Sequence, residues 1–148
     1  MWIRKLASGA TALHNAPMNE EICLSLELAA EKGGDITPAV YANYFARCEG
    51  SEALMSHIDD LVRGKMLNEV FRLLMEPTLA EDAKYLDFEV DNHRRAYMVE
   101  PHMYRNLLEA LHETVVDVVG EDWTPAMESE WQGRIEELLT EIANRHPT

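Results

Sequence analysis

The chain has 148 residues, 47% of them hydrophobic, and its 27 acidic and 13 basic residues give a formal net charge of −14. This length fits one domain with a sizeable core, and the hydrophobic content excludes a disordered polymer. The negative charge disfavours binding to nucleic acid or to an anionic membrane surface, because both repel an acidic protein. Cys23 and Cys48 show no metal-binding spacing, and no apolar run has the length of a membrane span. We therefore expect a globular cytoplasmic protein with two idle thiols.

Apolar residues recur at helical spacing along most of the chain, and no segment alternates with the period of a strand. Residues 1–17 are weakly patterned, and we expect them to form an arm or a short extra helix before one domain over residues 18–148. Glycine and proline mark most of the helix ends. The predicted helices run from Asn19 to Gly33, from Thr37 to about Gly50, from about Ile58 to Met75, over roughly 79–95, from Pro101 to Gly120, and from Pro125 onward.

His93 is the histidine that the pattern singles out. It falls on the same helical face as Leu86 and Val90, at positions i, i+4 and i+7. Imidazole is a good ligand for haem iron, and Arg94 directly after it could meet the carboxylates of a haem at the rim of a pocket. The simpler interpretation, a surface or hydrogen-bonded histidine near a helix end, stays open.

A second metal motif is incomplete. Glu109-x-x-His112 matches one half of a di-iron carboxylate site, but the chain holds no second copy of the motif. We therefore favour a carboxylate-bridged metal site much less than a haem site.

Three segments in the same order along the chain resemble the bacterial single-domain globins and the haem domain of flavohaemoglobins. They are LELAAEKGGDITPAVYANYF (26–45), HRRAYMVEPHMY (93–104), and the stretch from Leu107 through VVGEDWTPAMESEW to Leu139. The resemblance covers about residues 20–145. It implies an all-α, globin-like fold of six to eight helices.

The same resemblance implies a cofactor, haem b, with its iron bound by His93. Tyr41 would donate a hydrogen bond to a bound diatomic gas, O₂ or NO, in sensing, storage or detoxification. Met55 stands where the family places a phenylalanine that packs on the haem. The other side chains implied to contact the cofactor are Leu61, Val62, Arg63 and Met66 on the gas-binding side, and Leu86, Val90, Arg94, Val99 and Leu108 on the His93 side.

The resemblance implies no catalytic residue of the chain's own. Turnover as an NO dioxygenase would need an external electron donor, because the resemblance is to the haem domain alone. A homodimer is one option for the assembly.

The sequence departs from the family at the proposed iron ligand. His93 lies eleven residues before Tyr104, where family members have ten, and Arg94 occupies the ten-residue position. Either the corner has one extra residue or the ligand has been lost. The glutamate that supports this histidine in flavohaemoglobins falls near Gly133. The candidates for the polar gas-side residue are Leu61, Val62 and Arg63, with Met66 or Leu67 one turn further on.

These departures motivate two alternatives. One is a haem-free globin fold used as a sensory or interaction module. The other is a helical binding protein with no cofactor and a different topology, such as an up-and-down bundle.

Overall fold

The computed structural model describes residues 19–76, 79, 83–97 and 101–145, and its regular structure over these residues is entirely helical. This confirms the all-α prediction. The predicted N-terminal arm, residues 1–17, lies outside the described residues. The elements are α2 (Glu20–Gly33), α3 (Thr37–Arg47), α4 (Ser51–Leu54), α5 (Asp60–Met75), α6 (Ala83–Tyr97), α7 (Pro101–Val119), the short 3₁₀ helix η2 (Gly120–Asp122) and α8 (Pro125–Arg145).

Local chemistry sets several of the helix ends. Gly34 ends α2 in the left-handed region, with a φ of 65°, and its N–H donates to the Ala30 carbonyl. Asp59 begins α5, because its side chain accepts a hydrogen bond from the Val62 N–H at 2.9 Å. Thr124 begins α8 in the same way, because its hydroxyl oxygen accepts a hydrogen bond from the Met127 N–H at 3.1 Å.

The structure differs from the sequence prediction around residue 50. The second helix, α3, ends at Arg47, and Gly50 adopts a φ of 85° that begins a separate one-turn helix, α4. Glycine tolerates this backbone conformation without a steric penalty, so the chain can change direction there. The third helix also begins two residues later than expected, at Asp60, because Asp59 caps it.

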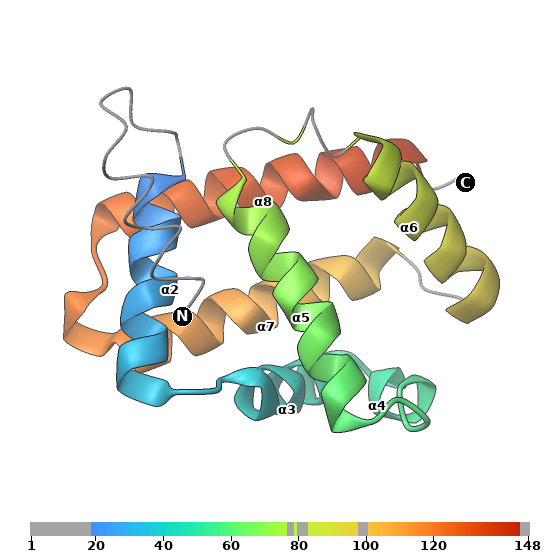
Figure 1. Cartoon of the computed structure of the whole chain (residues 1–148), viewed down its shortest axis with the longest axis horizontal. Helices are drawn as coiled ribbons and strands as arrows, with labels where there is room; N and C mark the ends of the chain where they lie inside the picture. The colour runs from blue at the N-terminus through green and yellow to red at the C-terminus, as the bar shows by residue number, and fades with distance from the viewer. Residues whose placement is uncertain (1–18, 77–78, 80–82, 98–100, 146–148) are drawn as a thin grey trace.

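The helices cross one another steeply. In Figure 1, α7 and α8 run along the long axis of the molecule, whereas α2 and α5 run across them. α3 packs most extensively on α7, α2 packs on both α7 and α8, and α6 packs on α8. The described helices therefore do not form an up-and-down bundle.

The main core lies where α2, α5, α7 and α8 meet. Leu111, Val115 and Trp131 are fully buried there, and the Trp131 indole donates a hydrogen bond to the Ser25 hydroxyl at 2.8 Å. Both cysteines are buried free thiols, as predicted. A second, smaller cluster gathers Tyr41, Tyr44, Cys48 and Ala110 between α3 and α7. This second cluster adjoins the cavities described below, because Tyr41 and Tyr44 also line them.

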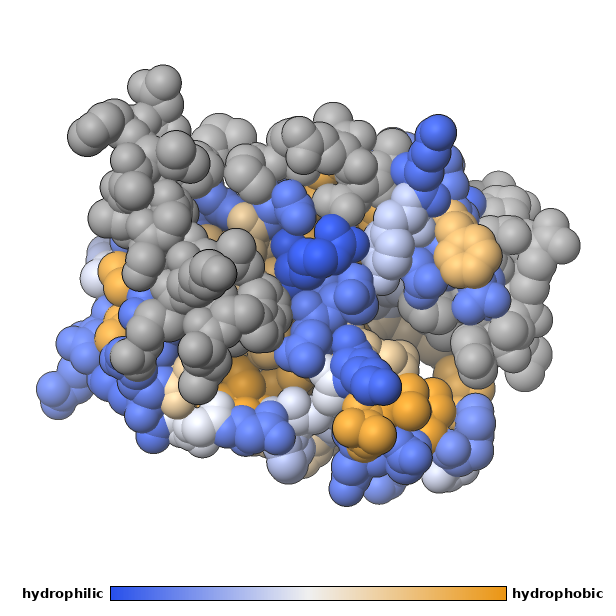
Figure 2. Space-filling view, viewed as in Figure 1, coloured by the Kyte–Doolittle hydropathy of each residue, from blue (hydrophilic) through white to orange (hydrophobic). Residues whose placement is uncertain are grey.

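The face shown in Figure 2 is mostly hydrophilic, with an orange apolar area over α4 and the start of α5. The exposed apolar residues at the start of α5 are Leu61 and Val62. Across the described residues, no helix has both the length and the apolar character needed to cross a lipid bilayer.

Candidate functional site

Two adjoining, partly open cavities lie between α5 and α6 and are also lined by α3 and α7. Their volumes are about 410 Å³ and about 170 Å³, and the larger falls in the size range of small-molecule sites. The residues that line both cavities are Tyr41, Met66, Glu89, Tyr104 and Leu107. The larger cavity extends toward α4 and is also lined by Tyr44, Leu54, Met55, His57, Ile58, Asp59, Val62, Asn92 and Met103. The smaller one extends toward α8 and is also lined by Glu69, Val70, Leu73, Tyr85, Leu86, Val90, Leu108, Leu138 and Ile142.

The structure brings most of the predicted cofactor-contacting side chains to these cavities. Those on the walls are Tyr41, Met55, Val62 and Met66 on one side, and Leu86, Val90 and Leu108 on the other. Leu61 lines neither cavity, and its side chain is 69% exposed. The backbone of His93 and Arg94 belongs to α6, but their side chains lie outside the described residues, as does the whole of Val99.

Tyr41 is a buried hydrogen-bond donor in the lining of both cavities. Only 3% of it is exposed, and its hydroxyl donates to the backbone carbonyl of Arg63 at 3.2 Å. Burial raises the pKa of Tyr41 to about 12, and the charge of Arg63 partly offsets this effect. The phenol is therefore protonated at neutral pH, and its O–H group remains a hydrogen-bond donor.

The guanidinium group of Arg63 lies close to the aromatic rings of Tyr41 and Phe45. Its Nη2 donates to the Met55 carbonyl at 3.0 Å, and its central carbon lies 5.1 Å from the ring centre of Phe45 and 5.7 Å from that of Tyr41. The Arg63 Nε is buried and has no hydrogen-bond partner among the described residues. Arg63 itself does not line the cavities, although its neighbour Val62 does.

Glu89 marks the opposite side of the site. It lines both cavities beside Tyr104, whose pKa is raised by burial and by the nearby Glu89 carboxylate. Burial, together with the charges of Glu69 and Glu89, also raises the pKa of Tyr85 to about 12. The sequence analysis missed Glu89, although its spacing from Leu86 places it on the cavity side of α6. The described lining therefore combines tyrosine hydroxyls from α3, α6 and α7 with the carboxylates of Asp59, Glu69 and Glu89.

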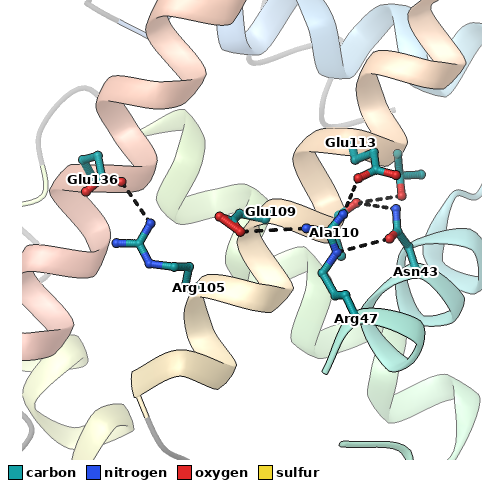
Figure 3. Close-up of polar contacts among 8 residues, drawn as sticks. Asn43, Arg47, Arg105, Glu109, Ala110, Glu113 and Glu136 are labelled. Atoms are coloured by element: carbon teal, nitrogen blue, oxygen red, sulfur yellow. Dashed lines mark hydrogen bonds and ion pairs between the residues drawn. The ribbon is translucent and has the colours of Figure 1, made fainter. Parts of the chain in front are cut away.

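A separate polar cleft of about 340 Å³ lies where α3, α7 and α8 meet (Figure 3). Arg47 on α3 forms ion pairs with Glu113 and, at 3.8 Å, with Glu109, and Arg105 pairs with Glu136 at 3.2 Å. Asn43 joins this network, because its side-chain oxygen accepts a hydrogen bond from the Nε of Arg47 at 3.3 Å. These side chains satisfy one another across the helix contacts.

The incomplete di-iron motif belongs to this same cleft. Glu109 points to Arg47, and His112 hydrogen-bonds to Glu128 at 3.0 Å. Within the part of the chain that the structure describes, no three His, Cys, Asp or Glu side chains come together as a metal-binding group. Glu109 and His112 therefore have their partners, an ion pair and a hydrogen bond respectively, among the protein's own side chains.

No protein-family model matches the sequence, and neither a curated protein nor a solved structure matches it. The interpretation of the cavities rests on their own geometry and on the sequence resemblance.

Proposed function

We propose that this chain is a globin-like haem protein that binds a diatomic gas, with the haem seated between α5 and α6. The observation that carries the proposal is the apolar cavity between these helices, because it combines a buried phenol donor, Tyr41, with a wall formed by α6, the helix of His93. The packing of α3 across α7 and of α6 on α8 supports a globin-like topology.

The residues present fit a flat, apolar cofactor. Met55, directly after α4, and Val62 and Met66 on α5 give the larger cavity an apolar lining, and Leu86 and Val90 on α6 do the same for the adjoining smaller one. Tyr41 adds a buried hydroxyl to this lining, whereas Arg63 lies outside it.

Each group would then have a distinct task. A bound haem would supply the iron that holds the gas. His93 would ligate the iron from α6, and Glu89, one helical turn earlier, offers a carboxylate of the kind that accepts the ring N–H of metal-bound histidines. Tyr41 would hydrogen-bond the gas by turning its single O–H from the Arg63 carbonyl to the ligand, and the apolar side chains of α5 would exclude water.

The test is a titration of the purified protein with hemin, followed by visible absorption. We expect a bound Soret band for the wild type, and a weakened or shifted band for His93→Ala. His102→Ala is the matched control, because His102 is an exposed histidine on α7 away from the cavities. An unchanged spectrum in His93→Ala would assign the iron to another ligand, and the first to test would be His57, which lines the larger cavity.

One observation favours the haem-free module as a second candidate. The described lining of the cavities holds three carboxylates, Asp59, Glu69 and Glu89, and no lysine or arginine. Haem itself carries carboxylates, which an acidic rim repels. A wild-type protein that stays folded but gives no bound spectrum with excess hemin would support this candidate and contradict the haem proposal.

A further inference from the structure

We infer that the two adjoining cavities form a binding site for a hydrophobic organic ammonium ion. Its charged head would lie beside Glu89 and the tyrosine rings of the larger cavity, and its apolar tail would fill the smaller one. Such a ligand needs no cofactor, so it goes beyond the haem proposal and does not depend on it. It would compete with a haem for the same space.

The larger cavity is lined by several aromatic rings. Tyr41 and Tyr44 come from α3 and Tyr104 from α7, and the first two are only 3% and 6% exposed. The face of an aromatic ring attracts a cation, and groups of such rings are a common binding site for alkylated ammonium ions. Three tyrosines around a cavity of about 410 Å³ therefore suit an ammonium head.

Glu89 supplies the opposite charge, because it lines both cavities where they adjoin. Burial raises the pKa of Tyr104, and the charge of the Glu89 carboxylate raises it further, so the carboxylate lies near this ring. Attraction to a carboxylate offsets the cost of taking an ammonium ion out of water. Asp59 and Glu69 add further carboxylates, and the described lining holds no lysine or arginine. The charges of the lining therefore favour a cation over an anion.

Two arginines outside the lining show that these tyrosines accept a positive charge. The guanidinium carbon of Arg63 lies 5.7 Å from the ring centre of Tyr41, and that of Arg72 lies 4.8 Å from the ring centre of Tyr85. Arg72 also pairs with Glu69 at 3.1 Å. The protein thus already places cations against rings and carboxylates of this site, which is the chemistry that the ligand head would use.

The smaller cavity suits an apolar tail. Its volume is about 170 Å³, and Leu73, Leu86, Leu108 and Leu138 line it from four different helices. An alkyl chain placed there leaves water, which the hydrophobic effect favours. Within the described part of the chain, no three His, Cys, Asp or Glu side chains gather as a metal-binding group. A charged end beside an apolar end therefore points to an amphiphilic cation and not to a metal ion.

The experiment compares three ligands that share the same hexyl tail: hexyltrimethylammonium, a cation; hexanol, which is neutral; and hexanoate, an anion. Isothermal titration calorimetry of the full chain without hemin measures the three dissociation constants. We expect the cation to bind about tenfold more tightly than hexanol, because it adds the attraction to the rings and to Glu89. Hexanoate should bind more weakly than hexanol, because the carboxylates of the lining repel it.

Glu89→Gln should weaken the binding of hexyltrimethylammonium about tenfold and that of hexanol less than about twofold, because it removes a charge but little volume. The matched control is Asp87→Asn, which changes the net charge equally on the same helix. Asp87 lines neither cavity, and its side chain is 65% exposed, so this variant should bind the cation as the wild type does.

Equal affinities of the wild type for the cation and for hexanol would overturn the inference. An equal loss of cation affinity in Glu89→Gln and Asp87→Asn would also overturn it, since that result indicates a general attraction to an acidic surface. Melting curves show whether each variant is folded, and the comparison of the three ligands on the wild type needs no variant. The hemin titration tests the haem proposal separately, so either idea can fail alone.

Discussion

The C-terminal end of α5 depends on one buried arginine from α8. Arg134 is 5% exposed at its side chain, and its Nη1 donates to the carbonyls of Leu73 and Leu74 at 2.8 and 3.3 Å. These carbonyls belong to the last turn of α5, where helical N–H partners run out. Arg134 also pairs with Glu137 at 2.9 Å. The side chain thus fixes the end of α5, the helix that carries one wall of the cavities.

Arg134→Met should destabilise the protein by about 3 kcal/mol. Hydrogen bonds from a charged donor contribute about 1.5–3 kcal/mol each, and the methionine fills much of the volume but leaves the carbonyls without their donor. The control is Arg105→Met, which removes the ion pair between Arg105 and Glu136. The side chains of these two residues are 49% and 60% exposed, respectively. We expect that loss to cost about 0–1 kcal/mol.

Urea denaturation followed by far-ultraviolet circular dichroism measures both values. With a slope of about 1–3 kcal/mol per molar urea, the Arg134 variant should unfold at a urea concentration roughly 1–3 M lower than that of the wild type. If the two arginine variants unfold at the same urea concentration, the account of the α5 end is wrong.

Three further predictions concern the site and the core. In hemin-loaded protein, Tyr41→Phe should release the bound gas about tenfold faster or more, since it removes a hydrogen bond worth about 1.5–3 kcal/mol. Flash photolysis with stopped flow measures the release rate, and an unchanged rate would remove Tyr41 from the site. Because burial raises the pKa of Tyr41 from 10.0 to about 12, the unfolded chain loses this proton first, and stability should fall as the pH rises from 10 to 12. Urea midpoints across that range should fall less steeply in Tyr41→Phe than in the wild type. Gly133→Ala should stabilise α8 by about 0.5–1 kcal/mol, because the added methyl group meets no neighbour. In Gly33→Ala the added methyl group would meet Val118 Cγ1 at 2.8 Å, so this variant should be less stable than the wild type. Thermal melts should therefore place the melting temperatures of the two variants on opposite sides of the wild-type value.

Local signals in the sequence were sufficient to predict where most of the helices begin and end. Asn19, Gly33, Thr37 and Pro125 mark ends that the structure places within a residue or so, because capping and backbone preferences act over one turn. The one-turn helix α4 could not be predicted, since four residues carry no periodicity.

The sequence by itself determined the fold class and the apolar face of α6. The spacing of Leu86 and Val90 is enough to make them one stripe, and both are buried. The sequence pattern did not indicate which of Leu61, Val62 and Arg63 faces the cavity. Neighbouring residues are only about 100° apart around a helix, and the rotation of α5 about its axis depends on packing partners that are distant in the sequence. The tertiary structure decided this: Leu61 faces outward, Val62 lines the cavity, and Arg63 lies against the aromatic rings of α3. The grouping of Tyr41, Val62 and Glu89 around one cavity likewise exists only after α3, α5 and α6 are packed together, because these residues lie far apart along the chain.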